Sequence, residues 1–144
     1  MSKVAKKAGH ARARGALFTA VLAVSLLSCR RDPSLSPAVL TLLPTAFDGG
    51  SMRDGERCGR AGDDMQARLF VSAPTLTFTL RGRSEGGAAF AVAVGPAASA
   101  RETAAPGEAV ERTFRLQAPT GRQTVSVRIA EGELCLAQLA LTQP

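Results

Sequence analysis

Four residue types that are central to much of enzyme chemistry are missing from most of this chain. After position 28, the 144-residue sequence contains no histidine, lysine, tyrosine or tryptophan. Their absence excludes serine–histidine and cysteine–histidine catalysis, serine–lysine dyads, Schiff-base lysines and histidine-ligated zinc in that part of the chain. No glycine-rich phosphate loop of the GxGxxG or GxxxxGKS/T type occurs either. Only carboxylates are left as candidate general bases, and we assign no catalytic residue.

The formal net charge of +6 is concentrated at the N-terminus. All three lysines and two arginines precede residue 29, whereas 13 arginines and all 12 carboxylates follow from Cys29 onward. The chain from Cys29 onward therefore has a net charge of only +1. Nucleic-acid recognition needs a net basic stripe, so this balance argues against a nucleic-acid partner.

Residues 1–28 have the parts of an export signal. Residues 1–15 contain five positive charges and no acid, and an uncharged, mainly apolar run of 13 residues follows at 16–28. This arrangement is typical of a secretory signal peptide. A membrane-spanning helix needs about 20 apolar residues, so the run is too short for a retained anchor. We expect residues 1–28 to be a helical signal peptide that is cleaved from the mature protein.

The signal ends in Leu26-Leu27-Ser28-Cys29, which resembles the lipobox of bacterial lipoprotein precursors. The resemblance implies cleavage before Cys29, a covalent lipid on Cys29 and attachment to a membrane of the cell envelope. Lipoproteins with aspartate after the cysteine usually stay in the inner membrane, so Arg30 favours the outer membrane. On this interpretation, residues 29–36 are the lipidated cysteine and a tether. The alternative is a soluble secreted protein in which Cys29 is incidental or removed.

The three cysteines are consistent with export. If Cys29 is reserved for lipid, Cys58 and Cys135 are left to form a disulfide in an oxidising compartment. A disulfide across so long a loop would stabilise the fold by about 4–5 kcal/mol on the chain-entropy model. Two free buried thiols are the competing interpretation. A metal site is poorer, because no histidine or third thiol is left to complete it.

Residues 37–144 are long enough for one domain, and their hydrophobic periodicity is mostly two. Alternation predicts strands at 75–81, with Leu76, Phe78 and Leu80 inward, and at 124–129, 88–94 and 113–116. Residues 38–43 and 66–71 are two further candidates. In the last segment, one face is predicted to contain Cys135, Ala137, Leu139 and Leu141.

Glycine- and proline-rich turns separate these segments. About seven or eight short strands separated by such turns predict an all-β fold, an antiparallel β-sandwich or jelly roll. Residues 96–110 are rich in alanine, and we expect a long mobile loop there, with a short helix as the alternative. The strand order and the final segment 133–141 (ELCLAQLAL) resemble galactose-binding-type jelly rolls. That resemblance implies an accessory sandwich of the kind found beside carbohydrate-active enzymes.

Five acidic residues are the candidate metal ligands: Asp48, Asp54, Glu56, Asp63 and Asp64. Arginines are interleaved with them, so one interpretation is a solvated loop with local ion pairs. The other is a calcium site, because oxygen-rich loops bind hard cations, although the spacing does not match an EF-hand. A pair of carboxylates that hydrolyses glycosides is a further alternative.

Platforms for sugar rings are scarce in the domain. It has only five phenylalanines, and Phe78, Phe90 and Phe114 fall on inward strand positions. Outward arginines are available for hydrogen bonds to sugar hydroxyls or carboxylates: Arg81, Arg83, Arg112, Arg115 and Arg128.

The sequence favours a lipid-anchored envelope lipoprotein whose β-sandwich is not an enzyme and serves in binding or structural interaction. Its expected partners are the membrane, through the lipid, and an envelope protein or polysaccharide. It needs no cofactor beyond the lipid on Cys29. The first alternative is a carbohydrate-binding module, with or without calcium, and the second is a carboxylate-dependent hydrolase.

Overall fold

The computed structural model describes residues 38–144. The signal peptide, Cys29 and the tether lie outside these residues. The described chain forms ten strands, with a single 3-10 turn, η1 (Pro44–Ala46), between the first two. The strands are β1 (Ala38–Leu42), β2 (Ser51–Arg53), β3 (Glu56–Arg60), β4 (Asp64–Val71), β5 (Thr75–Ser84), β6 (Ala88–Val94), β7 (Ala97–Ala98), β8 (Glu102–Ala104), β9 (Glu108–Gln117) and β10 (Gly121–Gln143).

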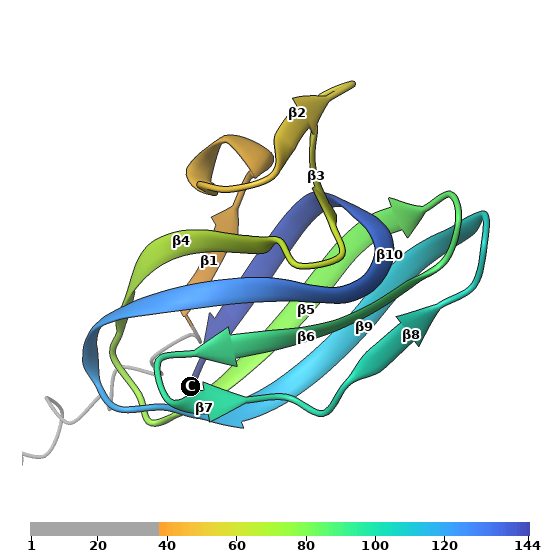
Figure 1. The fold of residues 1–144 in the computed structure, drawn as a ribbon. Coiled ribbons are helices and arrows are strands. Elements are labelled where there is room, and N and C mark those ends of the chain that lie inside the picture. The colour runs from red at the N-terminus through yellow and green to blue at the C-terminus, as the bar shows by residue number, and fades with distance from the viewer. Residues whose placement is uncertain (1–37) are drawn as a thin grey trace, which may run out of the picture. The chain divides into compact units, whose positions relative to one another are not determined.

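The long strand β10 belongs to both sheets of an antiparallel sandwich (Figure 1). Its first half pairs with β4 and β6, and β6 pairs in turn with β7 and β8. Its second half pairs with β1, β3 and β5, and β2 and β9 extend this second sheet. The predicted all-β antiparallel sandwich is confirmed. Within residues 38–144, no helix is long and apolar enough to cross a bilayer.

The core lies between the two sheets, and strand alternation predicted much of it. Leu76, Phe78 and Leu80 are fully buried, as are the two valines of 124–129. Phe90 and Phe114 meet edge to face from opposite sheets, with ring centroids 6.5 Å apart. Each fully buried side chain of this size contributes about 1.5–3 kcal/mol to folding. The core is therefore ample for a single domain.

The predicted inward face of the last segment is correct for Leu139 and Leu141 and wrong for Cys135 and Ala137, because β10 contains a bulge. The register with β5 shifts between Leu136 and Gln138. A bulge inserts one unpaired residue, so the inward positions change phase at Ala137. Leu134 and Leu136 face the core before the bulge, and Leu139 and Leu141 after it. Cys135 lies outside the core cluster and Ala137 is exposed.

The predicted long loop at 96–110 is also wrong, and no helix replaces it. Ala97–Ala98 and Glu102–Ala104 form β7 and β8 along the edge of β6, and β9 begins at Glu108. Ser99 holds this segment to β6, because its amide donates to the Val92 carbonyl at 2.7 Å and its Oγ accepts from the Val92 amide at 2.9 Å. Strands of two or three residues are too short to show alternation, which is why the pattern missed them.

Candidate functional site

The predicted acidic cluster is dispersed over a hairpin and the start of a strand. Asp54 and Gly55 form the turn between β2 and β3, both with positive φ (50° and 82°), as a tight hairpin turn requires. Asp54 and Glu56 both form ion pairs with Arg83 of β5. These two acidic side chains are thus neutralised by an arginine that was a candidate for sugar binding.

The other three acidic residues have separate partners. Asp63 accepts a hydrogen bond from the Arg60 amide at 2.8 Å. Asp64 Oδ2 accepts from Gln66 Nε2 at 3.0 Å and from Arg128 Nε at 3.3 Å. Asp48 pairs through its backbone with Gln66. Across the part of the chain that the structure describes, no three acidic, histidine or cysteine side chains are grouped as metal ligands. Calcium binding by the predicted set therefore has no preformed site.

A first hollow, of about 330 Å³, surrounds Glu133 at the bend of β10. The Glu133 carboxylate accepts hydrogen bonds from Arg53 Nη1 at 2.6 Å and Arg60 Nε at 2.9 Å. These two guanidinium groups lower the pKa of Glu133, and the Glu133 carboxylate in turn raises the pKa of Arg53. Cys58, which forms the disulfide to Cys135, lines the same hollow. Asp63 lines the hollow as well, so two arginines face two carboxylates, and the group is best explained as an ion-pair network.

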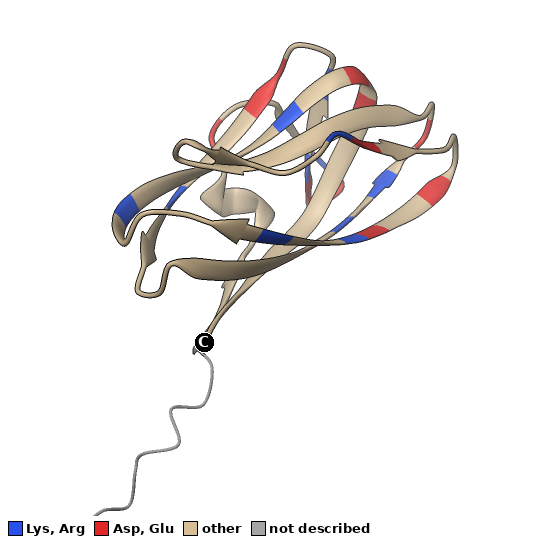
Figure 2. Ribbon diagram, turned by 90° about the horizontal axis from the view of Figure 1, so that it is seen from below, with Lys and Arg blue, Asp and Glu red and all other residues tan. Residues whose placement is uncertain are grey.

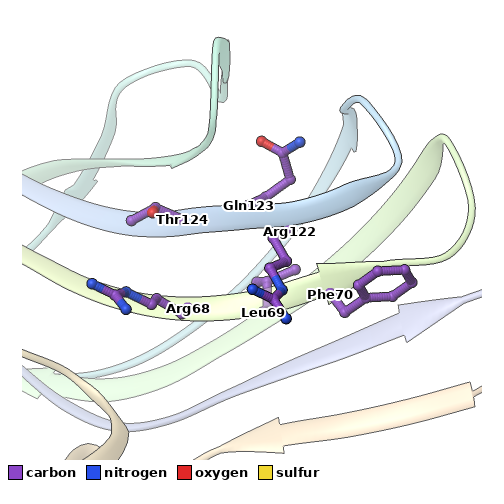
Figure 3. A pocket seen from close by; sticks show the side chains of 6 residues that line it. All are labelled: Arg68, Leu69, Phe70, Arg122, Gln123 and Thr124. Atoms are coloured by element: carbon purple, nitrogen blue, oxygen red, sulfur yellow. The ribbon is translucent and has the colours of Figure 1, made fainter.

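A second hollow, of about 600 Å³, lies where β4 runs beside the first half of β10 (Figure 3). Its lining residues are Arg68, Leu69, Phe70, Arg122, Gln123 and Thr124. Alternation along β4 buries Leu69 and Val71 and turns Arg68 and Phe70 outward. Across the strand pair, Phe70 lies opposite Arg122, and Arg68 lies opposite Thr124. The three long side chains therefore occupy the same outer face of this sheet.

Phe70 is the most exposed aromatic residue of the described chain, with 62% of its surface accessible. Figure 3 shows its ring at one end of the group and the Arg68 guanidinium at the other, with Arg122 reaching from β10 between them. A large apolar ring with so much exposure is unusual here, because the other phenylalanines among residues 38–144 are buried. An exposed ring held on a strand is a platform onto which an apolar ligand face can stack.

The backbone under Phe70 is held by a buried glutamine. Gln143, at the end of β10, is 6% exposed and donates from Nε2 to the Phe70 carbonyl oxygen at 3.2 Å. Its Oε1 accepts from the Ser72 amide at 2.6 Å, the Ser72 hydroxyl at 2.8 Å and the Ala73 amide at 3.3 Å. All of these groups belong to the connection that follows β4. The amide group therefore fixes the end of the strand that presents the ring.

The two arginines of this hollow differ from most others in having no acidic partner. Seven of the arginines in residues 38–144 form ion pairs, and Arg57 donates to a backbone carbonyl. Within these residues, neither Arg68 nor Arg122 makes an ion pair or a side-chain hydrogen bond, and Arg115 resembles them in this respect. No aspartate or glutamate occurs at 65–84 or 112–130. The acidic positions gather away from the end where the C-terminus lies (Figure 2).

Sequence reasoning missed this site, although one of its signals was present. Residues 66–71 were a candidate strand, and an aromatic residue on the polar phase of that strand predicts an exposed ring. Arg122 carried no such signal, because its place opposite Phe70 depends on the pairing of β4 with β10, about 50 residues later. Arg81, Arg83, Arg112 and Arg128, which were suggested for sugar binding, are all occupied by carboxylates.

No family model matches the sequence, and no curated protein matches it either. Among solved structures, the chain is similar to the CBM36-1 domain of a multidomain xylanase from the hindgut metagenome of Trinervitermes trinervoides. The TM-score is 0.58 at 15% identity, over 72% of this chain and 96% of that domain. A carbohydrate-binding module CBM36 in complex with calcium and xylotriose gives a TM-score of 0.57 at 13% identity, over 69% and 97% of the two chains.

The CBM35 module of Cellvibrio japonicus Abf62 is similar to the same degree, with a TM-score of 0.57 at 13% identity, over 72% of this chain and 92% of that one. Other matches are parts of enzymes; the chain covers only 35% of a family two carbohydrate esterase from Cellvibrio japonicus, for example. At these identities the likeness shows the fold. The jelly-roll fold that the strand pattern suggested is confirmed.

Proposed function

We propose that residues 37–144 form a non-catalytic carbohydrate-binding module, with the hollow between β4 and β10 as its binding site. The observation that supports this most directly is the exposed ring of Phe70 on the outer face of a sandwich of this fold. The apolar face of a sugar ring stacks on such a platform. Thr124 and Gln123, which line the same hollow, supply polar groups for the sugar hydroxyls.

The state of the carboxylates supports a binding role over hydrolysis. Glycoside hydrolysis uses one carboxyl group with a raised pKa as acid and a second as base or nucleophile. Nine of the eleven carboxylates in residues 38–144 form ion pairs with arginines. Hydrogen bonds from the Ala105 amide and Arg112 lower the pKa of Glu108, and hydrogen bonds from Arg53 and Arg60 lower that of Glu133. A lowered pKa is the opposite of what a general acid needs. The hollow beside Phe70 has no carboxylate in its lining.

The module would be displayed on the cell envelope through a lipid on Cys29. The lipobox resemblance of residues 26–29 supports this anchor, and Arg30 supports the outer membrane. Metabolic labelling with a radioactive fatty acid should mark the wild-type protein and leave Cys29→Ala unlabelled. Labelling of Cys29→Ala at the wild-type level would refute the anchor and leave the carbohydrate-binding proposal untouched.

The binding site is tested by affinity electrophoresis of the purified protein through gels that contain single polysaccharides. We expect retardation by at least one polysaccharide, and a loss of binding of about tenfold or more in Phe70→Ala, as for a central contact residue. Met52→Ala is the matched control, because Met52 is also an exposed apolar residue, on β2, at 45% exposure. The same gels with EDTA test calcium. Equal retardation of Phe70→Ala and wild type would overturn the assignment of the site.

A further inference from the structure

We infer that the ligand of this site is an anionic saccharide, whose acidic group binds Arg68 and Arg122 while a sugar ring stacks on Phe70. This inference rests on the proposed function and specifies its ligand. The acidic group is a carboxylate or a phosphate, because both accept paired hydrogen bonds from a guanidinium group.

The distribution of charge is the first argument. Residues 38–144 contain eleven arginines and eleven carboxylates, so the domain as a whole is neutral. The carboxylates are nevertheless absent from residues 65–84 and 112–130, which include the β4–β5 and β9–β10 connections. Arg68, Arg115 and Arg122 all belong to these stretches. One region of a neutral domain thus has a local positive potential, which raises the local concentration of anions and speeds their encounter.

The geometry of the two strands is the second argument. Arg122 lies directly across from Phe70, and Arg68 is two residues from Phe70 on the same strand face. Diagonal neighbours on one face of an antiparallel pair are about 7–8 Å apart at the backbone, so both guanidinium groups can reach one acidic group. Gln143 holds the adjoining backbone. The ring and the two cations are therefore presented together by a strand pair with a fixed register, which lowers the ordering cost of binding.

The lack of local partners is the third argument. A surface arginine that already pairs with a carboxylate must lose that contact before it binds a ligand. Arg68 and Arg122 have no such contact among the described residues, whereas Arg112 and Arg83 have several. Thr124, opposite Arg68, is uncharged. Nothing in the lining of the hollow repels an anion.

The experiment compares ligands that differ only in charge. Binding of the full-length protein, purified in detergent, is measured against polygalacturonate and its methyl ester, and against phosphomannan and unmodified mannan. We expect at least one acidic polymer to bind about tenfold or more tightly than its neutral counterpart at low salt. Binding should weaken steeply as NaCl is raised to about 0.5 M, where the Debye length falls to a few ångströms. The carboxylated and phosphorylated pairs distinguish the two sources of charge.

Arg68→Gln and Arg122→Gln should each weaken binding of the acidic polymer by about tenfold and thereby reduce the preference for the acidic over the neutral polymer. Arg115→Gln is the matched control, because Arg115 is also exposed and free of side-chain partners among the described residues, but lies on β9 of the other sheet. If Arg115→Gln weakens binding of the acidic polymer as much as the other two variants do, the assignment of Arg68 and Arg122 as the binding residues is refuted.

Three further outcomes separate this inference from the proposed function. Equal binding of acidic and neutral polymers, lost in Phe70→Ala, would overturn the anionic ligand and leave the carbohydrate-binding module standing. Binding to no polysaccharide would overturn both. Equally strong binding to vesicles of phosphatidylglycerol without sugar, lost in Arg68→Gln, would show a membrane-surface contact in place of a saccharide site and would also overturn both.

Discussion

Gln143, at the end of the last strand, donates its side-chain amide hydrogen to the backbone carbonyl oxygen of Phe70, 73 residues earlier in the chain. This contact joins the second half of β10, in one sheet, to the end of β4, in the other. Ala38 pairs with the same glutamine through the backbone. Gln143 therefore links β1 to the strand that presents the exposed ring.

Replacing Gln143 with alanine should destabilise the domain by about 1–3 kcal/mol, because the hydrogen bonds of its buried side-chain amide to Phe70, Ser72 and Ala73 would be lost. Urea unfolding measures the loss. Gln138→Ala is the control, since Gln138 is also on β10 and makes no side-chain hydrogen bond within residues 38–144. We also expect weaker polysaccharide binding in Gln143→Ala, through the displaced Phe70. If both glutamine variants unfold at the same urea concentration, the amide group has no structural role of the kind described.

The Cys58–Cys135 disulfide, predicted from the cysteine count, is present between directly opposed residues of β3 and β10. It lies on the face of its sheet that is turned away from the main core, yet both cysteines are at most 3% exposed. Titration of the denatured, unreduced protein should find neither thiol free.

Replacement of both Cys58 and Cys135 by serine should lower the unfolding free energy by about 2–5 kcal/mol, because the linkage spans 77 residues. Cys29→Ser is the matched control and should leave the stability of the domain unchanged. A double variant as stable as the wild type would mean that the disulfide adds nothing to this fold.

Local patterns predicted the parts of this fold that depend on neighbouring residues. Alternation put Leu76, Phe78 and Leu80 inward, and they are. It failed at Ala137, because a bulge depends on pairing with the partner strand and cannot be predicted from the residues of its own strand. The edge strands β7 and β8 were missed for a related reason. Their alanines have little strand preference, and the segment is ordered by β6.

The residues of the proposed binding site also differ in whether the local pattern or the pairing of distant strands determines their position. The outward position of Phe70 follows from the pattern of β4 alone, in which Leu69 and Val71 are the inward residues. The position of Arg122 opposite Phe70 follows only from the pairing of distant strands. The acidic residues are close in sequence, but in the fold they form ion pairs with different arginines from distant strands, such as Arg83 and Arg128. Spacing along the chain could not predict those ion pairs.

The bulge in β10 makes Gly82 a sensitive position. Gly82 lies opposite Leu136, and a Cβ atom there would overlap the Cys135 carbonyl oxygen. Because the obstacle is backbone in the middle of a sheet, Gly82→Ala should destabilise the domain by about 1–3 kcal/mol, as overpacking generally does. Gly86→Ala is the control, since no atom lies within 4 Å of the Cβ it would add. Thermal unfolding of the two variants tests this prediction. Equal melting temperatures would contradict the close contact between Gly82 and the Cys135 carbonyl oxygen.

Glu133 makes the stability of the domain depend on acid pH. Hydrogen bonds from Arg53 and Arg60 lower its pKa below the ordinary value of 4.5. A carboxyl group with a lowered pKa in the folded state stabilises that state fully above its unfolded pKa, and the contribution is lost as the pH falls through the lowered value. We therefore expect the melting temperature to decline below about pH 4.5 through this group.

Glu133→Gln should lower the melting temperature at pH 7 and make its decline in acid shallower. Glu131→Gln is the control, because the Glu131–Arg101 pair is exposed to solvent, with 74% of the Glu131 side chain accessible, and surface pairs of this kind contribute little. If the melting temperature falls as steeply in acid for Glu133→Gln as for the wild type, the pH dependence belongs to other carboxylates. Glu108 is then the first candidate, because the Ala105 amide and Arg112 lower its pKa.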